Sequence, residues 1–139
     1  MSEPYDLRRF VDAQTGGTYE RALAELRAGR KTSHWMWFVF PQLAGLGRSE
    51  TAVRYAVAGV DEARAYATHA LLGPRYDECC AALLGLGDVP MGDVLGQVDA
   101  QKLHSSLTLF AQVTSSPLID QLIDRHFDGQ PDPATLELI

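Results

Sequence analysis

Apolar residues recur at helical spacing along most of the chain. Within residues 19–28, apolar side chains lie three or four positions apart from Tyr19 to Leu26, which predicts one buried helix face. Gly29 follows at the place where a C-terminal cap is expected. No segment shows a sustained alternation of apolar and polar residues, so no strand is predicted. The pattern indicates an all-α fold.

Other segments carry the same periodicity and are bounded by helix start and stop signals. The segments predicted to be helical are 6–14, 19–28, 50–57, 62–67, 75–86, 100–113, 117–127 and 134–139. Ser49, Asp61 and Asp99 are predicted N-caps, and Asp132 with its following proline starts the last helix. The loops between segments are short, and we expect a single compact all-helical domain over residues 1–139, with about seven to eight short helices.

The composition of the chain indicates the broad class of protein to which it belongs. The chain has 139 residues, of which 46% are apolar and 22% are charged, as in an ordinary globular domain. No window approaches the run of about 18 apolar residues that spans a bilayer, so no membrane partner is expected. The segment 1–6 lacks the basic start and apolar run of a signal peptide. A cytoplasmic location is therefore expected.

Metal and cofactor chemistry receive no support from the sequence. Cys79 and Cys80 are adjacent, so we expect two free thiols, buried or half-buried, and no disulfide. The four histidines are not paired at the spacing of metal ligands, and no phosphate loop, dinucleotide fingerprint or nucleophile elbow is present. We expect no metal and no cofactor, and the sequence leaves open whether the protein is an enzyme.

Charge is unevenly divided along the chain. Residues 1–76 carry ten Lys or Arg against eight Asp or Glu, whereas residues 77–139 carry two against ten, and the net charge is −6. An acidic chain argues against binding extended nucleic acid, whose affinity needs many cations. A small anionic ligand needs only a local cluster, which Arg27, Arg30, Lys31 and His34 can supply. The alternative is that these are solvated side chains at a helix end.

The densest segment, 30–49, holds both tryptophans of the chain between cations and a glycine-bearing turn. If Ser33 caps a helix that runs to Val39, then His34 and Trp37 share one face, together with Phe38. Tryptophan and histidine are costly to bury unless their N–H groups find partners, which favours a helix that lines a cleft. The alternative is an aromatic core helix that ends at the following proline.

Two further features belong with this segment. Gly45 and Gly47 lead to Arg48 and Ser49, a pattern that fits an anion cradle or simply the start of the next helix. Downstream, the segment 102–108 carries Lys102, Ser106 and Thr108 in a helix interior that usually disfavours Ser and Thr. A polar lining and close helix packing both explain these residues.

Four motifs occur together in this chain: Arg30-Lys31, His34-Trp35-Met36-Trp37-Phe38-Val39-Phe40-Pro41-Gln42-Leu43, Leu72-Gly73-Pro74-Arg75 and Asp99 through Phe110. With these motifs the chain resembles the domain-of-unknown-function 1810 family. The resemblance extends from residue 6 to residue 136 and departs from the family pattern at Ala58 and Ala70. It implies an all-helical, armadillo-like fold and no established activity.

Three functions fit the sequence. The favoured hypothesis is a cleft that binds a small anionic or nucleotide-like ligand, with His34 as a candidate catalytic proton carrier. The predicted ligand-binding residues are Lys31, His34, Trp37, Gln42, Arg48, Ser49, Lys102, Ser106 and Thr108. The second hypothesis is a helical protein–protein interaction module with no catalytic activity. The third is that these segments serve packing alone. The sequence does not indicate an oligomeric state.

Overall fold

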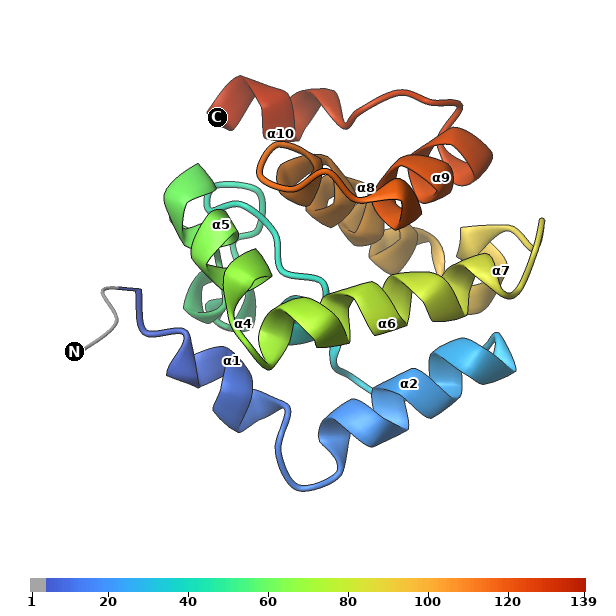
Figure 1. The fold of residues 1–139 in the computed structure, drawn as a ribbon, viewed down its shortest axis with the longest axis horizontal. Helices are drawn as coiled ribbons and strands as arrows, with labels where there is room; N and C mark the ends of the chain where they lie inside the picture. Colours follow the sequence, from blue (N-terminus) through green and yellow to red (C-terminus); the bar gives the residue numbers. More distant parts are fainter. Residues whose placement is uncertain (1–4) are drawn as a thin grey trace.

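Ten helices make up the part of the chain described by the computed structural model, residues 5–139 (Figure 1). Residues 1–4, part of the segment on which the signal-peptide expectation rests, lie outside the described residues. The helices are α1 (Arg8–Ala13), α2 (Thr18–Ala28), α3 (Met36–Val39), α4 (Glu50–Arg54), α5 (Val60–Thr68), α6 (Leu72–Leu84), α7 (Met91–Leu95), α8 (Gln97–Ala111), α9 (Pro117–His126) and α10 (Pro133–Leu138).

The long helices α6 and α8 organise the packing. Helix α6 packs against α2, α5 and α9, while α8 packs against α5, α7, α9 and α10. Figure 1 shows α2 and α6 running side by side, with α9 and α10 on the opposite side of α6. The all-helical prediction is confirmed for residues 5–139, although the armadillo-like stacking stays a prediction. No helix in this part of the chain is long and apolar enough to cross a membrane.

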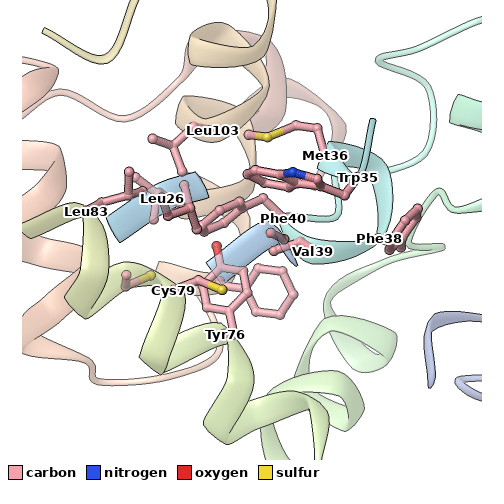
Figure 2. Close-up of a cluster of buried hydrophobic side chains, with 14 of the residues drawn as sticks. Leu26, Trp35, Met36, Phe38, Val39, Phe40, Tyr76, Cys79, Leu83 and Leu103 are labelled. Atoms are coloured by element: carbon pink, nitrogen blue, oxygen red, sulfur yellow. The ribbon is translucent and has the colours of Figure 1, made fainter. Parts of the chain in front are cut away.

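Aromatic side chains fill the centre of the core. Phe40 meets the Tyr76 ring edge to face, with 5.3 Å between centroids, and Tyr76 lies 4.5 Å from Phe110 of α8. Figure 2 shows Phe40 and Trp35 between residues of α2, α6 and α8. Offset and edge-to-face pairs of this kind add to the free energy gained from burial. Most of the dense aromatic segment is therefore core.

Several predicted helix ends are confirmed by cap geometry. Gly29 adopts a φ of 77° after α2, a left-handed conformation that favours glycine. The Ser49 hydroxyl accepts the Ala52 N–H at the start of α4. The Asp132 carboxylate accepts the Thr135 N–H at the start of α10. In each case a side chain or a glycine satisfies the unpaired end of a helix.

Other predicted boundaries are wrong. Asp61 and Asp99 lie inside the first turns of α5 and α8, because these helices begin at Val60 and Gln97 after glycines. Ser33 caps no helix, since α3 begins only at Met36. The helix count is ten rather than seven to eight, because the single-turn α3 and the short α7 add to the eight segments predicted to be helical.

The Ser and Thr residues of α8 form hydrogen bonds to α6 and to the segment before α10. Ser106 shares a hydrogen bond of 2.9 Å with the Tyr76 hydroxyl inside the core. The Thr108 hydroxyl donates to the His104 carbonyl and accepts the N–H of Asp132. Ser105 donates to the Asp132 carboxylate, whose pKa is lowered by hydrogen bonds from Thr135 and Ser105 that outweigh the effect of burial. Hydrogen bonds within the packed core therefore explain why these hydroxyl side chains lie in the interior of a helix.

The two cysteines are buried free thiols, as predicted. Both lie on the core side of α6 with Cys79 in the aromatic cluster (Figure 2). Burial raises the pKa of the Cys79 thiol to about 12, with a smaller contribution from the Glu78 carboxylate. Thiolate is the reactive form of cysteine, so these side chains behave as small apolar core residues.

The contact between α5 and α6 generates a stability prediction. A Cβ atom on buried Gly73 would lie 2.3 Å from the Ala67 carbonyl oxygen, so Gly73→Ala must push the two helices apart. We expect it to lower the free energy of unfolding by about 2 kcal/mol or more, measured by urea denaturation. The matched control is Gly59→Ala, because Gly59 has an extended φ of 178° and open space around the added methyl group. Equal stability of the two variants would contradict the close approach.

Candidate functional site

A groove of about 490 Å³ opens beside Trp37. Three parts of the chain form it: Trp37 of α3, the loop from Gln42 to Ser49 with Ala52 of α4, and the first two turns of α8. The side chains that line it are Trp37, Gln42, Leu46, Gly47, Arg48, Ser49, Ala52, Val98, Gln101 and Lys102. A concave surface that combines an aromatic ring with several polar groups is typical of ligand sites.

The start of the aromatic segment is fixed by a buried carboxylate. Glu25 of α2 is only 9% exposed, and its Oε1 atom accepts hydrogen bonds from the N–H groups of Thr32 and Ser33. The same oxygen accepts the Trp35 indole Nε1–H at 2.9 Å, and Oε2 accepts the Ser33 hydroxyl at 2.6 Å. Trp35 is thus buried with its N–H satisfied, and the chain is turned so that Trp37 lies at the groove.

Hydrogen bonding keeps Glu25 ionised in the core. Burial alone would raise the pKa of this carboxyl, but the hydrogen bonds from Ser33, Trp35 and Thr32 outweigh burial and lower the pKa to about 2. The carboxylate therefore holds its donors across the physiological pH range.

The end of α3 is held by a second buried group. The Phe38 carbonyl accepts the Gln14 side-chain amide at 2.8 Å and the Tyr66 hydroxyl at 3.2 Å. Arg75 donates in turn to the Gln14 side-chain oxygen. Gln14, which follows α1, and Tyr66 of α5 thus satisfy the C-terminal end of a helix too short to be stable alone. Both ends of α3 are fixed, which fixes the position of Trp37.

Two lysines share one carboxylate at the edge of the groove. Asp99 lies 2.9 Å from the Lys31 Nζ atom and 3.4 Å from the Lys102 Nζ atom. The Lys102 ammonium also stands 4.7 Å from the centre of the Trp37 ring, a cation–π contact. The Lys31 ammonium stands 5.2 Å from the Trp35 ring. The cluster carries two cations and one anion beside the half-buried Trp37.

The loop contributes polar groups that are free to bind. The side chains of Arg48 and Gln42 have no ion pair or hydrogen bond with any residue that the structure describes. The loop itself is held by its backbone, since the Gln42 carbonyl accepts the Val57 N–H at 2.9 Å and the Val57 carbonyl accepts the Ala44 N–H at 2.7 Å. The loop thus presents a guanidinium and an amide to the groove.

Five of the nine predicted ligand-binding residues line the groove: Trp37, Gln42, Arg48, Ser49 and Lys102. Lys31 is not among the lining residues, and its ammonium pairs with Asp99, which also pairs with the lining residue Lys102. Ser106 and Thr108 do not line it, because both are fully buried further along α8, where they bond to Tyr76 and to the segment before α10.

His34 is exposed and is not among the groove-lining residues. The helix face predicted for His34, Trp37 and Phe38 does not form, because α3 begins after His34 and Phe38 turns into the core.

Sequence reasoning missed Asp99 as a member of the cluster, because an Asp just before a predicted helix indicates an N-cap and no other role. Its position three residues before Lys102 on a predicted helix was the available signal, since side chains at that spacing meet. No feature of the sequence predicts that Val98 and Gln101 line the groove. The ion pair between Asp99 and Lys31 is a long-range contact that no local pattern contains.

Over residues 5–139, no group of three or more His, Cys, Asp or Glu side chains gathers where a metal ion could be held. The groove lining consists of cationic, amide, hydroxyl and apolar groups, a set that suits anions rather than metal ions.

The fold and the groove define a small all-α protein of helices packed around two central helices. The chain belongs to the DUF1810 family, which is described as a protein of unknown function and whose sequence model matches residues 4–139. It is similar to the conserved hypothetical protein Rv1873 from Mycobacterium tuberculosis, known from a crystal structure. The two share 45% sequence identity and a TM-score of 0.95, with 99% of this chain and 98% of the other covered. No curated protein matches the chain.

The Glu25 network predicts how stability depends on pH. The pKa of this carboxyl is about 2 in the folded protein and 4.5 for the free group, so its contribution is complete above pH 4.5 and is lost as the pH falls toward 2. We expect Glu25→Gln to lose about 2 to 3 kcal/mol of unfolding free energy at pH 7 and less at lower pH.

Urea denaturation at several pH values measures this effect. The control is Glu20→Gln, since Glu20 lies on the exposed side of the same helix. A constant difference between Glu25→Gln and the wild type from pH 7 down to pH 3 would contradict the role of an ionised Glu25.

Proposed function

We propose that the groove binds a small anionic ligand that carries a planar ring, such as a nucleotide. The observation that supports this proposal is the gathering of an unpaired guanidinium, an ammonium and a half-exposed indole in one hollow. Arg48, Lys102 and Trp37 supply these groups. The guanidinium fork suits phosphate oxygens, and the indole suits a ring.

Each lining residue has a chemical role in this proposal. Lys102 stands over Trp37, so a ligand whose charge lies next to its ring meets both side chains together. The Gln42 amide both donates and accepts, which suits the edge of a heterocycle. The Ser49 hydroxyl already accepts the Ala52 N–H, and its own hydrogen remains free to donate to an anion. The geometry supports binding, and we assign no reaction to the groove.

A second candidate function is a helical interaction module without catalytic activity. The observation that favours it is Val98, which is 70% exposed and lines the groove next to Leu46. Exposed apolar side chains around a groove are typical of surfaces that bind proteins. Competition separates the two functions, because a small ligand in the groove and a docked protein segment would exclude each other.

Isothermal titration calorimetry with adenosine monophosphate and adenosine tests the proposal. We expect the monophosphate to bind and adenosine to bind much more weakly, because Arg48 and Lys102 act on the phosphate. Arg48→Met should weaken the monophosphate roughly tenfold or more, as loss of a charge-assisted hydrogen bond does. Trp37→Leu should weaken both compounds. The control is Arg21→Met, which removes an equal charge from the exposed face of α2.

Equal effects of Arg48→Met and Arg21→Met would contradict a site at the groove. A wild-type protein that binds neither adenosine monophosphate, sugar phosphates nor inorganic phosphate would contradict the proposed function itself.

The close approach of Gly47 to α4 predicts how a substitution in the loop affects the groove. A Cβ atom on Gly47 would lie 2.6 Å from the Ala52 Cβ atom, so the loop can approach α4 this closely only with glycine. We expect Gly47→Ala to move Arg48 and Ser49 and to weaken binding of adenosine monophosphate, with little loss of stability, since Gly47 is exposed. Adding Ala52→Gly removes the clash and should restore binding. A double variant that binds no better than Gly47→Ala would contradict this account.

A further inference from the structure

We propose that Asp99 is a built-in competitor of the ligand for Lys102, and that a phosphate monoester, which carries more charge than a carboxylate, is the class of anion that draws this lysine away from it. The inference rests on the proposed function of the groove and concerns how the same site is regulated. Its starting point is the one carboxylate that touches both lysines of the cluster. No other carboxylate of the described residues pairs with either lysine.

The two lysines are not equivalent. Lys31 is held firmly, because its side chain is 9% exposed, its ammonium lies 2.9 Å from Asp99, and its backbone N–H donates to the Val94 carbonyl. Lys102 is 23% exposed, lies 3.4 Å from Asp99 and lines the groove. Lys102 is therefore the cation that can leave Asp99 and turn to a ligand.

The second lysine makes this exchange possible. Asp99 is 18% exposed, and leaving a largely buried carboxylate unpaired is costly. When Lys102 turns to a ligand, Asp99 keeps the shorter ion pair with Lys31. The cluster thus releases one cation without creating an unpaired anion.

Competition of this kind sets a threshold for the ligand. An incoming anion must attract the Lys102 ammonium more strongly than a carboxylate that is already in contact with it. A carboxylate ligand offers the same chemistry as Asp99 and gains little, whereas a phosphate monoester carries up to two negative charges and three acceptor oxygens. Like-charge repulsion from Asp99 weakens both kinds of ligand. The favoured class is therefore a phosphate monoester next to a ring.

Phenyl phosphate and benzoate are suitable probes, because they carry the same ring and differ in the anionic group. We expect the wild-type protein to prefer phenyl phosphate. Asp99→Asn should bind both probes more tightly, roughly tenfold for phenyl phosphate and by a smaller factor for benzoate, because benzoate carries a single charge and attracts the released Lys102 less. The variant should also be less stable without ligand, since two ammonium groups then face each other. Calorimetry and thermal unfolding measure these effects.

A double variant keeps the test valid if Asp99→Asn does not fold. Lys31→Met with Asp99→Asn removes one cation and one anion, so the net charge of the cluster stays the same while Lys102 is released. We expect it to bind phenyl phosphate more tightly than the wild type does. The control is Asp93→Asn, which removes an equal charge from an exposed residue of α7 outside the groove lining and should leave both affinities unchanged.

The outcomes separate the two proposals. A wild type that binds phenyl phosphate, with variants at Asp99 that bind it equally or more weakly, overturns the competition and leaves the proposed function intact. If neither the wild type nor the double variant binds any phosphate probe, the proposed function and the competition both fall. If Asp93→Asn tightens binding as much as Asp99→Asn does, the effect comes from the overall charge of the protein. This result would also overturn the inference.

Discussion

The hydrogen bonds around the Glu25 carboxylate are the constraint on which the site depends. The side chain is buried, yet the N–H groups of Thr32, Ser33 and Trp35 keep it ionised. This arrangement places Trp35 inside the core and turns Trp37 toward the groove. Without an acceptor for its indole N–H, Trp35 would be costly to bury, and the segment that carries Trp37 would have no fixed course.

The groove is assembled from pieces that have no stability of their own. Helix α3 is a single turn, α4 is scarcely longer, and the loop between them is tied down by backbone hydrogen bonds to Val57. Their order comes from side chains far away in sequence, such as Gln14 and Tyr66 at the Phe38 carbonyl. The core and the groove are therefore energetically linked, because the contacts that bury the aromatic residues also hold the polar lining in place.

The sequence predicted the fold class and the long helices, because these depend on local periodicity and on caps such as Ser49 and Asp132. It could not predict which way each side chain of 33–39 faces, since α3 follows the hydrogen bonds of Glu25 rather than a helical repeat. The sequence also could not show that Ser106 and Thr108 are core residues rather than residues of the ligand site. Their partners, Tyr76 and the N–H of Asp132, are distant in sequence and meet them only in the folded chain.

The two tryptophans, so close in sequence, are two independent optical reporters. Trp35 is sealed in the core and bonded to Glu25, so its emission reports on that hydrogen-bond network. Trp37 is half-exposed under the Lys102 ammonium, so its emission responds to whatever moves that charge. A protein with Trp35 alone would report the integrity of the fold, and one with Trp37 alone would report the state of the groove.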